Sequence, residues 1–118
     1  MVSAVMLVVG SLAGCSTLDR QEDLEQLENK LASNASAEDY LAAALLYQRQ
    51  AQRLEIQASR YEQEAAVITP LEDPKEFRRA GLRVVAQLRR KQAEDFLQLA
   101  ADHRQKAEKM LNSQKPRE

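Results

Sequence analysis

The sequence predicts an all-α protein: a long antiparallel helical hairpin with a coiled-coil-like, alanine-rich seam, preceded by a shorter N-terminal helix. After residue 15 the chain is rich in Ala, Gln, Glu, Leu and Arg and holds a single glycine, Gly81, as is typical of long helices. No stretch alternates apolar and polar residues as a strand does. Alanine recurs every seven residues in two long segments, and this repeat predicts the seam between two helices.

The first long helix is expected to begin near Ala37 and to end near Thr69. Ser36 has the side chain of a helix N-cap, and Asp39 supplies an acidic third residue, so the two form a capping pattern. Pro70 ends the helix because proline lacks the backbone donor and restricts the residue before it.

The second long helix is expected to begin at Pro74, capped by Asp73, with Glu76 as its third residue. It should continue to about Leu111, which makes residues 36–112 the hairpin and leaves residues 113–118 as a disordered tail. The link from Pro70 to Asp73 is short, so the two helices are expected to be antiparallel neighbours. Their arms would be about 50 Å long at 1.5 Å per residue.

The seam register follows from folding the chain about that link, which pairs residues whose numbers sum to about 144. The expected alanine layers are Ala58 with Ala86, Ala51 with Ala93, Ala44 with Ala100, and Ala37 with Ala107. Larger residues fill the space between layers, with Tyr47 expected near Phe96, and Tyr40 near His103. The pattern resembles the Alacoil, an antiparallel helix pair in which alanine in each heptad permits close packing.

Residues 15–35 are expected to form a tether and a shorter helix over residues 19–32, with Leu24, Leu27 and Leu31 on one face. Residues 33–36 are typical of a break. We expect this helix to fold back over the open base of the hairpin, and the alternative is a continuous stalk. The residues expected to need cover are Leu41, Leu45, Leu97 and Leu111.

The beginning of the chain has an apolar run from Val2 to Val9 and then the sequence Leu12-Ala13-Gly14-Cys15. These four residues resemble the lipobox of bacterial lipoproteins. The resemblance implies that residues 1–14 are a signal peptide and that Cys15 carries the lipid (diacylglyceryl and palmitate). It also implies a protein bound to the membrane of the cell envelope, and Ser16 favours the outer membrane, facing the periplasm. Export signals open with positive charge, and no Lys or Arg precedes Cys15, so we expect the true start to lie upstream. The alternative interpretation of the run is a buried apolar segment.

The sequence predicts no enzyme, cofactor or metal site. It has no Ser-His-Asp set and no glycine-rich phosphate loop, and zinc would need three or four clustered N or S ligands. His103 is the only histidine, and we expect it to be partly buried and bonded to a tyrosine hydroxyl. The competing hypothesis is a periplasmic binding module that holds a metal or small ligand at an oligomer interface through His103, Met110 and Tyr40.

Charge and a second apolar stripe favour a protein partner or a homo-oligomer. Residues 78–91 hold six basic and no acidic residues, which most simply form a solvated face balanced by acidic residues of the other arm. No aromatic residues interleave with them, so nucleic acid is not expected. Phe77, Gly81, Val84 and Leu88 form a stripe separate from the seam. The sequence therefore predicts a non-enzymatic structural or protein-interaction module whose candidate partner surface is Phe77, Arg83, Val84, Leu88 and Arg90.

Overall fold

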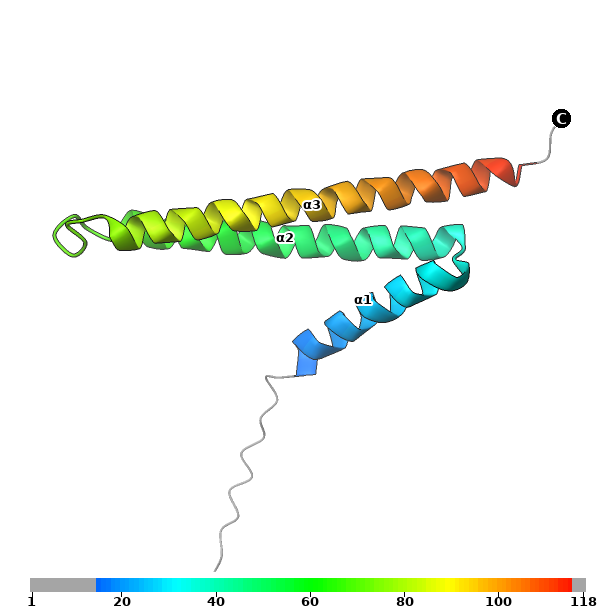
Figure 1. The fold of residues 1–118 in the computed structure, drawn as a ribbon, viewed down its shortest axis with the longest axis horizontal. Helices are drawn as coiled ribbons and strands as arrows, with labels where there is room; N and C mark the ends of the chain where they lie inside the picture. Colours follow the sequence, from blue (N-terminus) through cyan, green and yellow to red (C-terminus); the bar gives the residue numbers. More distant parts are fainter. Residues whose placement is uncertain (1–14, 116–118) are drawn as a thin grey trace, which may run out of the picture.

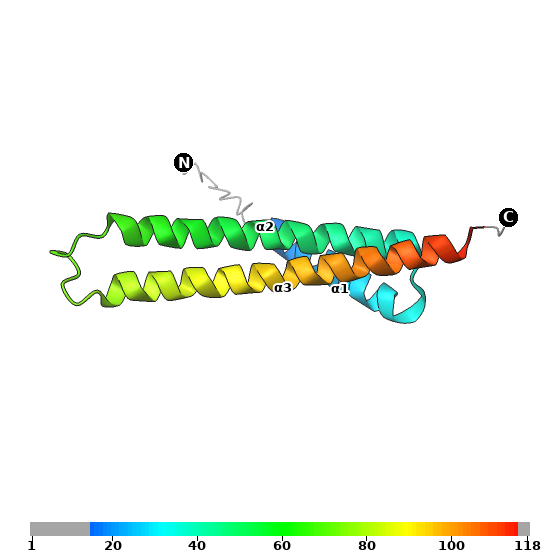
Figure 2. The ribbon, with the colours of Figure 1, turned by 90° about the horizontal axis from the view of Figure 1, so that it is seen from above.

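The computed structural model describes residues 15–115, and the side chains from Asp23 onward. The expected signal peptide over residues 1–14 and residues 116–118 of the expected tail lie outside the described residues. Three helices follow one another in the chain: α1 (Cys15–Asn34), α2 (Ala37–Val67) and α3 (Phe77–Ser113) (Figure 1). Residues 15–115 contain no strand, and α2 and α3 lie antiparallel along their length (Figure 2), which confirms the helical hairpin.

The start of α2 is the capping structure that the sequence predicts. The Ser36 hydroxyl accepts a hydrogen bond from the Asp39 backbone N–H at 3.3 Å, and the Asp39 carboxylate accepts one from the Ser36 backbone N–H at 3.0 Å. The Ser36 backbone bond, followed by Lys30 at 3.1 Å, lowers the pKa of the Asp39 carboxyl. The helix ends at Val67, and Ile68 is already extended.

The predicted start of the second long helix is wrong. Helix α3 begins at Phe77 rather than Pro74, so the connection covers residues 68–76. The residue before the helix, Glu76, has a left-handed backbone with φ 60°, which is uncommon for a residue other than glycine. Asp73 still caps α3 from a distance, because its carboxylate accepts from the backbone N–H groups of Arg78 at 3.4 Å and Arg79 at 3.0 Å. The chain thus uses the expected capping residue with a longer turn.

The core is the alanine seam, in the expected register. Ala44 packs in one buried cluster with Ala100, and Ala51 with Ala93 in another. Ala37 packs with Ala107 at the base of the hairpin. The alanines of the fourth expected layer, Ala58 and Ala86, are each completely buried. Buried alanine at the same heptad position of both helices permits close backbone approach, which leaves the larger residues to fill the space between layers.

At the turn end of the seam, arginine takes the alanine position. Arg79 lies one heptad before Ala86, at the position that the register pairs with Ala65, and both Arg79 and Ala65 are buried. Its guanidinium group is satisfied locally: Nε donates to the Asp73 carboxylate at 3.3 Å and Nη2 to the Asp73 carbonyl at 2.9 Å. The seam therefore closes at the turn with a partly buried ion pair.

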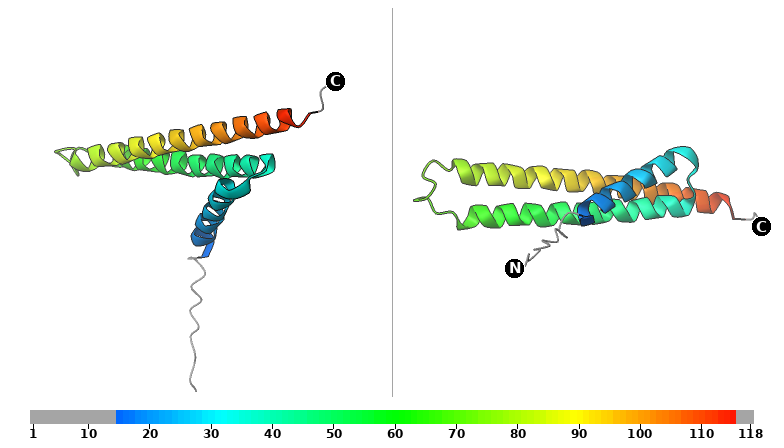
Figure 3. Two further views of the ribbon diagram at one scale, coloured as in Figure 1. Left: turned by 45° about the vertical axis from the view of Figure 1, so that its right-hand side comes forward. Right: turned by 90° about the horizontal axis from the view of Figure 1, so that it is seen from below.

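Helix α1 folds back onto α2, which excludes the continuous stalk. Leu24, Leu27 and Leu31 pack against the cluster that contains Ala43 and Tyr47. Polar contacts hold the same interface, since the Tyr47 hydroxyl donates to Glu28 at 3.0 Å. From there α1 runs away from the hairpin towards its own N-terminal end (Figure 3).

The expected cover for the base of the hairpin is wrong. All four leucines that α1 was expected to cover remain exposed: Leu41, Leu45, Leu97 and Leu111. For Leu41 the physical reason is the side of α2 that α1 occupies. Residues two apart on a helix lie about 200° apart at 3.6 residues per turn, so Leu41 lies on the opposite flank from Ala43, which α1 contacts.

Across residues 15–115, none of the helices combines the length and the apolar character needed to cross a membrane.

Candidate functional site

The most exposed apolar side chains of α3 lie on one face near the turn. Phe77 is 77% exposed, Val84 62% and Leu88 54%, whereas Ala86 between them is completely buried in the seam. With Gly81 these residues are spaced four, three and four apart, which places them in one stripe. At 100° per residue the stripe lies almost opposite the seam, so the hairpin itself cannot cover it. We call these four residues the distal stripe.

Nothing around Gly81 in the hairpin requires a glycine at this position. A Cβ atom built on it would meet nothing within 4 Å, and its φ is not positive. Glycine inside a helix costs about 0.5–1 kcal/mol relative to alanine. The hairpin would therefore accept a larger side chain at this position.

Two exposed apolar residues at the same end of the hairpin were missed from the sequence. Val67 is 75% exposed and Leu71 is 93% exposed, and they lie on either side of the start of the turn. Their exposure could have been predicted from the sequence, because neither residue occupies a seam position of the α2 heptad repeat. They extend the apolar character of the distal end beyond the stripe.

Most of the basic residues between positions 78 and 91 form ion pairs within the hairpin. Arg90 forms a bidentate pair with Glu62 and a second contact with Glu55 at 3.6 Å, and Glu62 is the main cause of its raised pKa. Arg78 lies 3.6 Å from Glu64. These contacts agree with the expectation that acidic residues of the other arm balance the positive charge of this face.

Of the five residues expected to form the partner surface, the structure groups three on one face. Phe77, Val84 and Leu88 share the distal stripe. Arg90 points to α2 across the seam, and Arg83 lines a shallow depression with Glu62. The two arginines therefore belong to the flank of the hairpin rather than to the rim of the stripe.

His103 lies in a stack of rings at the base of the hairpin. Its ring centroid is 5.6 Å from that of Tyr40 and 5.2 Å from that of Tyr47, and Tyr47 in turn stacks on Phe96 at 5.9 Å. The expected neighbours are confirmed, but the expected bond to a tyrosine hydroxyl is wrong. His103 Nδ1 donates instead to the Leu99 carbonyl at 2.7 Å.

The tyrosine hydroxyl has another partner, on α1. Burial, followed by the bond to Glu28, raises the pKa of Tyr47 to about 12. Tyr47 therefore joins the ring stack to α1. Met110, the other residue considered for a ligand site, packs against the cluster of Ala37, Tyr40 and Ala107.

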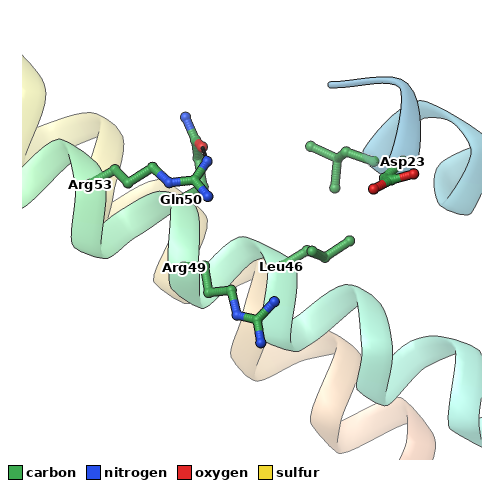
Figure 4. Close-up of a pocket in the computed structure, with 6 residues that line it drawn as sticks. Asp23, Leu46, Arg49, Gln50 and Arg53 are labelled. Carbon is green, nitrogen blue, oxygen red and sulfur yellow. Dashed lines mark hydrogen bonds between the residues drawn. The ribbon is translucent and has the colours of Figure 1, made fainter. Parts of the chain in front are cut away.

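A cleft opens where α1 diverges from α2. It encloses about 430 Å³, and its lining residues are Asp23, Leu24, Leu46, Arg49, Gln50 and Arg53 (Figure 4). Arg53 donates to Gln50 at 3.4 Å within the lining. In the part of the chain that the structure describes, no three His, Cys, Asp or Glu residues lie close enough to hold a metal ion. The cleft offers two guanidinium groups, one amide and one carboxyl group to solvent.

Cys15, the expected site of lipid attachment, is the first residue of α1, and its side chain lies outside the described part. Compared with known proteins, the chain matches no family model, no curated protein and no solved structure.

Proposed function

We propose that this protein is an envelope-anchored helical lipoprotein that acts as a non-enzymatic structural or protein-interaction module. Lipid on Cys15 would hold it in the outer membrane, facing the periplasm, and the distal stripe would be its contact surface. The observation that carries the proposal is the row of large apolar side chains exposed on a face of α3 that the seam cannot cover.

The anchor is supported by the lipobox-like sequence that ends at Cys15. A single acyl chain gives only marginal membrane binding, and two chains on one cysteine give stable attachment. Cys15 begins α1, and α1 runs out from one side of the hairpin (Figure 1). An anchor at this position would connect to the hairpin through a helical spacer.

The contact surface is supported by its composition and by its rigid base. Interfaces between proteins have an apolar centre that is depleted of charge, and aromatic residues are enriched there. Phe77, Val84 and Leu88 supply such a centre on a helix whose other face is fixed by the seam. Solvent-exposed apolar residues in one contiguous group mark interaction sites more often than scattered ones do.

The anchor is tested by replacing Cys15 with Ser. The wild-type chain should sediment with membranes and take up a fatty-acid probe, whereas Cys15→Ser should do neither, because acylation needs the thiol. Ser16→Ala, which keeps the thiol, is the matched control and should behave as the wild type does. Recovery of the wild-type chain in the soluble periplasm, without the probe, would contradict the proposal.

The contact surface is tested by replacing Val84 and Leu88 together with Ser. Crosslinking in intact cells should lose the products that the wild-type chain gives, while the helical content stays the same, because neither residue lies in the seam. Leu97→Ser with Leu111→Ser removes two comparably exposed leucines from another flank and should keep the crosslinks. If the Val84/Leu88 variant keeps every crosslink, the distal stripe is not a contact surface.

A further inference from the structure

We propose that the partner of the distal stripe is a second copy of this chain, docked antiparallel along α3 about a two-fold axis that passes between Gly81 and Val84. The inference rests on the proposed function in two respects, since it takes the stripe to be a contact surface and the chain to be anchored in a membrane. It adds the identity of the partner and the register of the contact.

The stripe is complementary to itself in this register. In an antiparallel pair of identical helices, residues whose numbers sum to a constant lie opposite each other. With a sum of 165, Phe77 lies opposite Leu88 of the second copy, and Gly81 lies opposite Val84. All four positions of the stripe are then used, and each large side chain meets either a large apolar residue or the space above the glycine.

This pairing gives Gly81 a role that the isolated hairpin does not. The glycine faces open space in the hairpin and weakens the helix that contains it. Small residues allow helix backbones to approach closely, so Val84 of a second copy can fill the space above Gly81. Because the axis is two-fold, the same contact forms twice.

The charges beside the stripe are compatible with the antiparallel pair. The side chains that flank the stripe on α3 are Arg78 and Val85 on one side, and Ala80 and Gln87 on the other. In the 165 register Arg78 lies near Val85 of the second copy, and Ala80 near Gln87, so these four flanking positions bring no like charges together. A parallel pair in register would place Gly81 against Gly81, which leaves a void in the contact.

The contact is small, which decides how it must be tested. Residues 77–88 span about 17 Å of helix, a short contact compared with standard interfaces. Confinement to a membrane raises the effective concentration of two copies and makes such a contact effective. The experiment therefore uses the full chain in the membranes of the cells that express it.

The register is tested by crosslinking two differently tagged copies with a short bis-maleimide. One copy carries Phe77→Cys and the other Leu88→Cys, and the pair should give a covalent heterodimer. Phe77→Cys on both copies should not, because these two positions lie about 16 Å apart along the axis in the antiparallel pair. Gln98→Cys, at an exposed position of α3 about three turns beyond Leu88, is a second negative partner for Phe77→Cys. Two tagged copies whose only cysteine is Cys15 measure the background level of crosslinking.

Gly81→Leu tests the pairing independently of stability. A leucine has open space in the hairpin and favours the helix, so the thermal unfolding midpoint should hold or rise. The same leucine would occupy the space that Val84 of the second copy needs, so the Phe77–Leu88 heterodimer should be lost. A heterodimer of undiminished yield in Gly81→Leu would overturn the proposed register.

The outcomes separate this inference from the proposed function. If no Phe77–Leu88 heterodimer forms, while substitution of Val84 and Leu88 abolishes a crosslink to a different protein, self-pairing is overturned and the contact surface stands. If no crosslink of either kind depends on the stripe, both are overturned. A heterodimer that forms in the stated pairs and is lost in Gly81→Leu supports both.

Discussion

At the scale of single residues, Asp73 joins the turn to the first residues of α3. Its carboxylate accepts from the backbone N–H groups that begin α3, and its side chain and carbonyl bind the buried Arg79 guanidinium. The bond from the Arg79 backbone is the main cause that lowers the pKa of the Asp73 carboxyl, and the Arg78 backbone bond adds to it. The ionised form is thus the form that the folded state prefers.

We therefore expect Asp73 to make the hairpin sensitive to acid. Because its pKa is lower in the folded chain than in the unfolded chain, its contribution to stability is present above the unfolded value of about 3.9 and is lost as the pH falls through the folded value. Asp73→Asn should lower the thermal unfolding midpoint at neutral pH and should reduce the fall of that midpoint below about pH 4. Asp39 has a lowered pKa too, so some acid dependence should remain in the single variant and shrink further when Asp39→Asn is added. Identical pH profiles for the wild type and Asp73→Asn would refute this role.

At the scale of the helices, the seam depends on the small size of its alanines. Ala51 and Ala93 are buried in the same layer, with Leu54 beside them. Because both alanines are buried between the helices, a larger side chain at either position is expected to push the two helices apart. The surrounding aromatic layers would then lose contact as well.

Ala51→Leu or Ala93→Leu should each lower the free energy of unfolding by about 1–3 kcal/mol, the usual cost of overpacking a core. Gln52→Leu introduces the same side chain next to Ala51 but on an exposed position, so it is the matched control. Chemical unfolding followed by circular dichroism measures all three. Equal unfolding midpoints for the three variants would show that the layers are not closely packed.

The seam could be predicted from the sequence because a heptad repeat fixes which residues face each other once the direction of the helices is known. The start of α3 could not, because Asp73 caps the helix through bonds to residues five and six positions later rather than from the adjacent position. The side of α2 on which α1 packs could not be predicted from the sequence either. It depends on tertiary contacts such as Tyr47 with Glu28, which no local pattern of α1 specifies.

At the scale of the whole molecule, the position of α1 bears on how two copies could share one membrane. Helices α2 and α3 lie side by side (Figure 2), and α1 leaves the pair on one face (Figure 1). The distal stripe lies almost opposite the seam, so pairing through it would extend the row of helices sideways from α3. A two-fold axis perpendicular to that row returns the second α1 to the same face as the first. The N-terminal ends of both α1 helices, which carry the proposed lipid anchor, would then lie on the same side of the pair.

The arrangement of the pair can be measured with spin labels on the full chain in membranes. Gln98 and Gln105 are exposed and one heptad apart on the outer face of α3. In the 165 register, labels on Gln98→Cys should lie about 45 Å apart between copies, and labels on Gln105→Cys about 65 Å apart, at 1.5 Å per residue. The increase of about 20 Å per heptad is the signature of an antiparallel pair, because equal positions of a parallel pair stay close along the whole helix. Gly81→Leu in the same labelled chains should abolish both distances. Two short and equal distances would instead show parallel pairing and contradict the two-fold axis between Gly81 and Val84.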